Sequence, residues 1–137
     1  MVKRIAIIDG KGGGIGKVLT EKIRRAYMDD IEIWVFGTNT AATTLMLNAG
    51  ADDGATGENA IVTSINKVDF VISSLSLVMP NALLGEVTPK IAEAVSSCSP
   101  PKILLPLSRG NIHLVGAKPG PLPHLVDEVV RYLKEVI

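Results

Sequence analysis

Short apolar runs alternate along this chain with segments whose apolar residues recur at helical spacing. Runs of 4–8 residues that are rich in β-branched side chains and end in glycine, serine or proline are typical of buried strands. On this basis strands are predicted over residues 5–8, 31–36, 69–73 and 102–105, with a short fifth strand of undetermined direction over 112–115. Apolar residues make up 47% of the chain and aromatic residues only 4%, so we expect an aliphatic core.

The intervening segments have the periodicity and end signals of amphipathic helices. Asn39 is a suitable N-cap, and Thr88-Pro89 places a cap before a proline at the first helical position. Helices are therefore predicted from the glycine-rich segment to Tyr27, over 40–49, 58–67 and 89–97, and from Pro123 onward. Residues 52–57 are predicted to form a loop.

The alternation of strands and helices predicts how the chain is arranged. Such alternation requires crossover connections, which make the strands parallel and place helices on both faces of the sheet. The expected fold is α/β: a small doubly wound, mostly parallel sheet of Rossmann-like type. The expected order of the first four strands is 2-1-3-4, with the fifth at an edge. A chain of 137 residues suits one domain, 1–137.

A cluster of five glycines in seven positions lies between the first predicted strand and the first predicted helix. Such a cluster is tolerated where the backbone needs a positive φ or where a ligand approaches it closely. The N-terminus of the following helix offers unpaired N–H groups and the positive end of a dipole, which suit a phosphate. Gly10 and Gly16 could serve the turn alone, which leaves Gly12, Gly13 and Gly14 in excess. The predicted phosphate-binding residues are Gly10, Lys11, Gly12, Gly13, Gly14, Ile15 and Gly16.

This turn resembles two known nucleotide loops and matches neither family throughout. Gly10, Gly14 and Gly16 fit G-x-x-x-G-I-G, which resembles the cofactor loop of short-chain dehydrogenases, but the Tyr-x-x-x-Lys catalytic pair of that family is missing. Residues 11–17 resemble the variant P-loop of partitioning ATPases, with one extra residue in the spacing. Val18 also stands where a hydroxyl should hold magnesium. The resemblance therefore implies a nucleotide ligand but identifies no catalytic residue. The departures from the P-loop pattern make ATP hydrolysis an unfavoured function.

Further ligand contacts are predicted at the carboxyl ends of the other strands, where open parallel sheets bind their ligands. These residues are Thr38, Asn39, Ser74, Ser108 and Arg109. An acidic residue that would hold ribose hydroxyls is missing from the end of the second predicted strand, which favours a phosphorylated ribose. No arginine accompanies Thr38 and Asn39 to receive that phosphate. NAD, NADP and other nucleotides therefore stay open as the cofactor.

The charge balance and the histidine and cysteine residues argue against several classes of partner and site. Fourteen basic and fourteen acidic residues balance without a basic run, which argues against nucleic-acid and membrane partners. His113 and His124 have no partner at metal-ligand spacing, so no metal is predicted. Cys98, at a predicted helix C-terminus, is a poor nucleophile, and a lone cysteine suits a reducing compartment. No signal-like segment opens the chain, so a cytoplasmic location is expected.

The whole chain resembles a family of short bacterial proteins known only as a domain of unknown function. The segments that carry the resemblance are 8–17, 37–39, 54–60, 84–90 and 121–125. It implies one Rossmann-like domain and brings no activity. Two functions remain: a protein that binds a phosphate-bearing small molecule, as an enzyme or a sensor, and a non-catalytic interaction module without a ligand. The apolar segment 75–84 additionally predicts a homo-oligomer.

Overall fold

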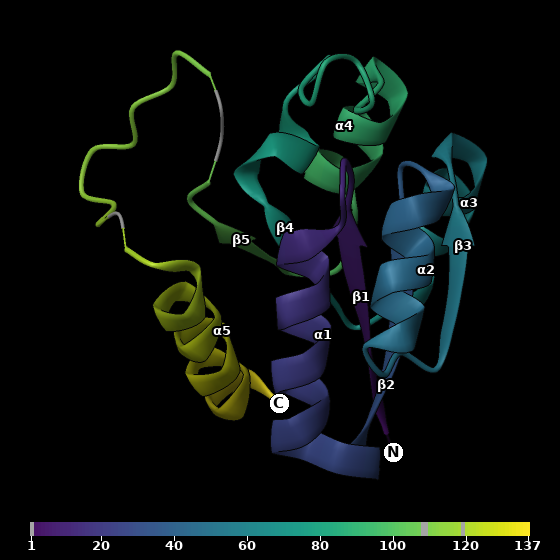
Figure 1. Cartoon of the computed structure of the whole chain (residues 1–137), viewed down its shortest axis with the longest axis vertical. Helices are drawn as coiled ribbons and strands as arrows, with labels where there is room; N and C mark the ends of the chain where they lie inside the picture. The colour runs from purple at the N-terminus through teal and green to yellow at the C-terminus, as the bar shows by residue number, and fades with distance from the viewer. Residues whose placement is uncertain (1, 108–109, 119) are drawn as a thin grey trace.

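A single parallel sheet of five strands forms the centre of the molecule (Figure 1). The computed structural model describes residues 2–107, 110–118 and 120–137. The strands are β1 (Lys3–Asp9), β2 (Ile31–Gly37), β3 (Asp53–Thr56), β4 (Phe70–Ser74) and β5 (Lys102–Leu105), in the order β3-β2-β1-β4-β5. This is the strand order of one dinucleotide-binding half with two more strands on the other side of β1. The predicted doubly wound, Rossmann-like fold is confirmed.

The central strand β1 shows why its sequence is apolar without interruption. It pairs in parallel with β2 on one side and β4 on the other, so that Ile5 lies beside both Ile33 and Phe70. Ile5 and Ile7 belong to the core on one face of the sheet, and Ala6 and Ile8 belong to the core on the other. A strand that is covered on both faces cannot alternate with polar residues.

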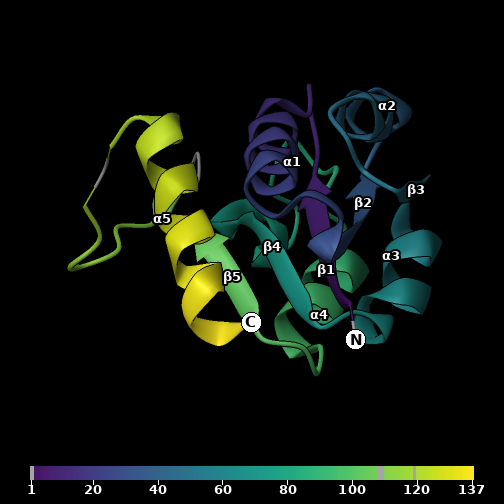
Figure 2. The ribbon, with the colours of Figure 1, turned by 90° about the horizontal axis from the view of Figure 1, so that it is seen from below.

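In the described ranges, five α-helices cover the two faces of this sheet. They are α1 (Gly14–Tyr27), α2 (Thr40–Asn48), α3 (Glu58–Ser64), α4 (Pro89–Ser97) and α5 (Leu122–Val136). The first, second and fifth pack on one face, and α3 and α4 pack on the other (Figure 2). Both predicted caps are present: the Asn39 side chain accepts from the Ala42 N–H at 2.9 Å, and the Thr88 hydroxyl accepts from the Ile91 N–H at 3.1 Å.

Two predictions about the sheet edges are wrong. Residues 53–56, predicted to be a loop, form the edge strand β3, which pairs with β2 from Trp34 to Gly37. Its side chains are mostly exposed, so the strand has no apolar pattern, and a Cβ at Gly54 would lie 2.8 Å from the Val35 side chain. Residues 112–115, predicted to be a strand, are irregular and exposed. Among the strands that the structure describes, none pairs with this alternating segment.

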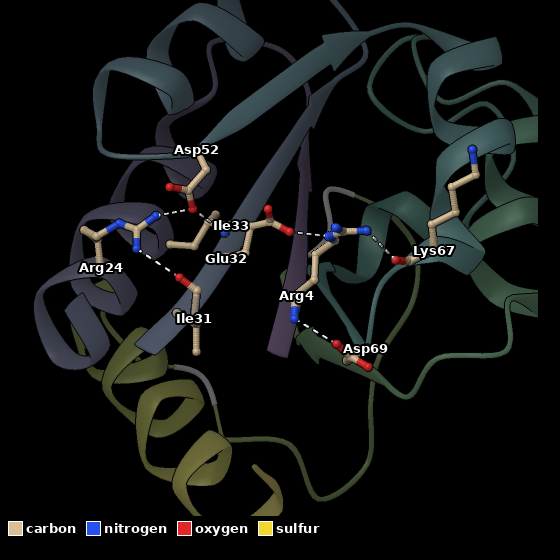
Figure 3. A network of polar contacts seen from close by, with 8 residues as sticks. All are labelled: Arg4, Arg24, Ile31, Glu32, Ile33, Asp52, Lys67 and Asp69. Atoms are coloured by element: carbon tan, nitrogen blue, oxygen red, sulfur yellow. Dashed lines mark hydrogen bonds and ion pairs between the residues drawn. The ribbon is translucent and has the colours of Figure 1, made fainter. Parts of the chain in front are cut away.

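Charged side chains at the amino ends of the strands form a structural network (Figure 3). Arg4, near the start of β1, pairs with Glu32 of β2, and its backbone N–H donates to Asp69, just before β4, at 2.8 Å. Arg24 of α1 pairs with Asp52, which also accepts the N–H of Ile33 in β2. These contacts join neighbouring strands at one end of the sheet. The opposite end, where the strands have their carboxyl termini, carries the glycine-rich turn (Figure 1).

Candidate functional site

A cavity of about 720 Å³ lies beyond the carboxyl ends of β1, β4 and β5. Its lining comes from the glycine-rich turn (Asp9–Ile15), from Ser74 and Ser76 after β4, and from the apolar residues Met79, Ala82, Leu83, Leu84 and Leu107. The chain leaves β1 for β2 on one side and later returns to β4 on the other, so this is the topological switch point at which open α/β sheets bind ligands. The volume is in the range of small-molecule sites, roughly 300–1,000 Å³.

At three of the five glycines in the turn, a side chain would meet other parts of the protein. A Cβ at Gly10 would lie 2.5 Å from the Thr38 hydroxyl, and one at Gly16 would collide with the Met46 side chain. Gly13 has a φ of 77° and precedes α1 as its N-cap, and a Cβ there would lie 2.8 Å from the Cα of Ala42. The structural roles predicted for Gly10 and Gly16 agree with these contacts. Gly13, which the sequence leaves in excess, is also needed by the fold.

The other two glycines, Gly12 and Gly14, have no such requirement. A Cβ at either position meets no atom within 4 Å, and neither has a left-handed φ. Both residues are exposed and line the cavity. The N–H groups of Gly12 and Gly14 have no acceptor within the described parts of the chain. The Gly13 N–H, by contrast, donates to the Gly10 carbonyl at 2.9 Å. The turn therefore presents two open backbone positions with available donors to the cavity.

The Asp9 side chain, at the end of β1, holds the two ends of this turn together. Its carboxylate is buried and accepts the N–H of Gly10 at 2.8 Å and the N–H of Gly16 at 2.7 Å. Burial raises the pKa of Asp9, and the negative charge of Glu86 raises it further, while the two N–H donors act in the opposite direction. Asp9 thus fixes the turn to the first residues of α1 and uses one of the donors that a helix N-terminus offers.

A second carboxylate, Glu86, reaches the turn from the segment between β4 and α4. Its Oε1 accepts three hydrogen bonds, from the Lys11 N–H at 2.8 Å, the Thr38 hydroxyl at 2.7 Å and the Asn39 side-chain amide at 2.9 Å. The hydrogen bond from Thr38 is the largest of several contributions that lower the pKa of Glu86. An acidic group therefore does stand at the carboxyl end of β2, and the expectation that this place lacks one is wrong.

The segment that carries Glu86 has an unusual backbone. Asn81, Leu83 and Leu84 all have left-handed φ values, of 66°, 56° and 55°. Such a conformation costs a non-glycine residue on the order of 1–3 kcal/mol. The segment is held by the fully buried Val87, whose carbonyl accepts the Asn81 N–H at 2.7 Å and whose N–H donates to the Ala82 carbonyl at 3.1 Å. The result is an apolar wall of the cavity, formed by Met79, Ala82, Leu83 and Leu84, that adjoins the glycine-rich turn.

The predicted site residues fall into four groups. The cavity is lined by Gly10, Lys11, Gly12, Gly13, Gly14, Ile15 and Ser74. Gly16 is buried beneath it, in the first turn of α1. Thr38 and Asn39 are hydrogen-bonded to Glu86 beside the turn and do not line the cavity. Ser108 and Arg109 lie outside the described residues.

Glu86 and most of the apolar wall are not among the predicted site residues. No local signal marks Glu86, since its partners are 47 to 75 positions away along the chain. The apolar segment 75–84 is predicted only to contact a second copy, yet Leu77 is fully buried within the chain and Leu83 lines the cavity. Leu84 is 93% exposed.

Among residues 2–107, 110–118 and 120–137, no three His, Cys, Asp or Glu side chains are grouped as metal ligands would be. No helix in the described ranges combines the length and the apolar character that crossing a membrane requires. Cys98 is buried, and its thiol contacts the Val95 carbonyl at 3.2 Å.

The sequence model of one protein family covers almost the whole chain. The family is described as Domain of unknown function (DUF3842), its model matches residues 4–137, and the chain belongs to it. No curated protein matches the chain.

Several solved structures are similar in fold. Apo histidine-tagged saccharopine dehydrogenase (L-Glu forming) from Saccharomyces cerevisiae is 16% identical with a TM-score of 0.49, over 89% of this chain and 23% of that one. This chain therefore spans about a quarter of the length of the yeast protein. The universal stress protein from Archaeoglobus fulgidus is 13% identical with a TM-score of 0.43, over 76% of this chain and 98% of that one. The same protein in complex with dAMP gives a TM-score of 0.42.

Proposed function

We propose that this member of the DUF3842 family binds the phosphate group of a nucleotide or dinucleotide at the turn between β1 and α1. The observation that carries the proposal is the pair Gly12 and Gly14. Neither packing nor backbone conformation requires glycine at these positions, yet both face the cavity with available N–H groups. A phosphate that contacts the backbone there is a physical reason to have no side chain.

Charges of both signs surround the turn, and the Glu86 carboxylate, which accepts the Lys11 N–H, is a negative one beside it. The N-terminus of α1 carries the equivalent of roughly half a positive charge, and the exposed Lys11 and Lys17 flank it. The Asp9 carboxylate opposes an anion, but it is buried and already accepts two N–H groups. Gly12 and Gly14 line the cavity, and a phosphate bound there would replace water as the acceptor of their N–H groups.

The size and the lining of the cavity favour a nucleotide over inorganic phosphate. A volume of about 720 Å³ would leave most of the space empty around a single phosphate. In the same cavity, Met79, Leu83 and Leu107 offer apolar surface suited to a base or a nicotinamide ring. NAD, NADP and mononucleotides all combine a phosphate with such a ring, and they are the ligands to test.

A thermal-shift screen of the parent protein tests this function. The ligands are NAD, NADP, ATP, AMP and inorganic phosphate, each at saturating concentration. A ligand at 100 times its dissociation constant stabilises the folded state by about 2.7 kcal/mol, which raises the Tm by several degrees. We expect at least one nucleotide to do so and inorganic phosphate to act more weakly. A flat response to all five would favour the interaction module, for which the exposed Leu84 offers a contact.

A further inference from the structure

We infer that Glu86 selects the ribose at this site, so that a nucleotide with a free 2′-hydroxyl binds in preference to one with a 2′-phosphate. The inference rests on the proposed function and adds to it the class of nucleotide. It reverses the expectation from the sequence, in which the missing acidic residue after β2 favours a phosphorylated ribose. Glu86 supplies the acidic group from a different part of the chain.

The position of Glu86 is the first support for this role. The carboxylate joins the phosphate turn to the end of β2, since one oxygen accepts from Lys11 in the turn and from Thr38 and Asn39 after β2. In sheets with this strand order, the adenosine ribose of a dinucleotide lies between these two places, and an acidic side chain holds its hydroxyls. Glu86 does not itself line the cavity, but it is hydrogen-bonded to Lys11, which does, so a carboxylate stands beside the turn although the chain at the end of β2 has none.

The hydrogen bonds of Glu86 give the second support. All three donors that the described residues supply go to Oε1. An ionised carboxylate can accept about four hydrogen bonds over its two oxygens. Oε2 therefore remains able to accept from ribose hydroxyls, and the three donors on Oε1 hold it in a fixed orientation. Because these donors also lower the pKa of Glu86, the group is an acceptor at neutral pH.

A 2′-phosphate would lose these interactions and add a repulsion. It replaces a hydroxyl donor by a group that carries a charge of about −1.5 to −2 at neutral pH. The charge of Lys11 acts on Glu86 and reduces this repulsion, so the lost hydrogen bond to the carboxylate contributes much of the difference. Hydrogen bonds to charged groups are among the strongest that proteins make.

The backbone strain next to Glu86 gives the third support. Leu83 and Leu84 adopt left-handed conformations directly before Gly85 and Glu86. A Cβ at Gly10 would lie 2.9 Å from the Leu83 side chain and 3.1 Å from Glu86 Oε1, so the segment is pressed against the turn. Strain of this kind persists where the surrounding structure enforces a particular placement, often at a binding site.

The test compares NAD with NADP, which differ only in the 2′-phosphate. Dissociation constants are measured by isothermal titration calorimetry for the parent, for Glu86→Gln and for the control Glu93→Gln. The control removes the same charge from the exposed face of α4. We expect the parent to bind NAD at least about tenfold more tightly (about 1.4 kcal/mol). Glu86→Gln should bring that ratio close to one, and Glu93→Gln should keep it.

Because the ratio compares two ligands on one protein, a change in the stability of a variant does not affect it. Equal binding of NAD and NADP to the parent, or a ratio that Glu86→Gln leaves unchanged, would overturn the inference and leave the proposed function standing. Tighter binding of both ligands to Glu86→Gln by the same factor would also overturn it, because Glu86 would then compete with the ligand for the Lys11 N–H. If only mononucleotides bind, AMP and adenosine 2′,5′-bisphosphate replace the pair, with the same expected ratio. If no nucleotide binds the parent, both the proposed function and this inference fail.

Discussion

The substitution Gly13→Ala separates the glycines that the fold requires from those it does not. Gly13 has a φ of 77°, and an alanine Cβ there would lie 2.8 Å from the Cα of Ala42 and 3.2 Å from its Cβ. The obstacle is the backbone of α2 at the buried Ala42, which cannot rotate away as a side chain can. The left-handed conformation costs about 1–2 kcal/mol and the overpacking about 1–3 kcal/mol, so we expect a loss of roughly 2–5 kcal/mol in the free energy of unfolding.

The matched variant is Gly14→Ala, one residue further along. Its Cβ meets no atom within 4 Å, and the residue is the first of α1. Because alanine is a better helix former than glycine, we expect a change within about 0.5 kcal/mol, towards higher stability if any. Urea denaturation followed by circular dichroism measures both variants. With an m value of about 1–3 kcal/mol per molar, the midpoint of Gly13→Ala should fall by about 1 M or more. Equal stability of Gly13→Ala and the parent, or an equal loss in Gly14→Ala, would refute this division of the glycines.

Three further predictions concern the polar groups around the turn. Asp9→Asn should lower the free energy of unfolding by about 1–3 kcal/mol, because the new amide must point a donor at the N–H of Gly10 or Gly16. A urea midpoint equal to that of the parent would contradict the hydrogen bonds described for Asp9. The pKa of Glu86 is lowered in the folded protein, so its contribution to stability should be present above the usual pKa of 4.5 and be lost as the pH falls through the lower folded value. The stability difference between the parent and Glu86→Gln, measured from pH 7 to pH 3, should therefore shrink at low pH, and a difference that grows there has the wrong sign. Thr43→Val should lower the free energy of unfolding by about 1–3 kcal/mol, because the buried Thr43 hydroxyl accepts the Gly37 N–H at 3.0 Å. A Tm equal to that of the parent would show that water replaces the hydroxyl as the acceptor.

The sequence predicts the elements that are buried and fails on those that are not. The run 5–8 is apolar because β1 has helices on both faces, and this leaves a strong local signal. β3 leaves none, since its residues are mostly exposed and it is defined by backbone pairing with β2. Residues 112–115 show the reverse error: an alternating pattern that the fold does not bury. The pattern of apolar residues along the chain indicates which side chains are buried, and an edge strand such as β3 buries few of them.

The candidate site divides in the same way. The glycine-rich turn is visible in the sequence because each glycine loses more backbone entropy on folding than another residue would, so a cluster of glycines indicates a conformational or binding requirement. Which glycine serves which purpose depends on neighbours such as Thr38, Ala42 and Met46, and these come from other elements. Glu86 reaches the turn from 75 residues beyond Lys11, through a backbone conformation that leucine rarely adopts. Contacts of this kind arise only when the chain is folded.

The binding of a nucleotide to Gly14→Val tests the central proposal most directly. Valine at this exposed helical position meets no protein atom at its Cβ, so the variant should fold, but its side chain would project into the space of the bound phosphate. Gly120→Val is the control, since a Cβ there also meets no atom within 4 Å and Gly120 does not line the cavity. Calorimetric titration with the tightest binder among NAD, NADP, ATP and AMP should show at least about a hundredfold weaker binding to Gly14→Val (about 2.7 kcal/mol) and parental binding to Gly120→Val. A folded Gly14→Val protein that binds as tightly as the parent would place the phosphate elsewhere and contradict the account.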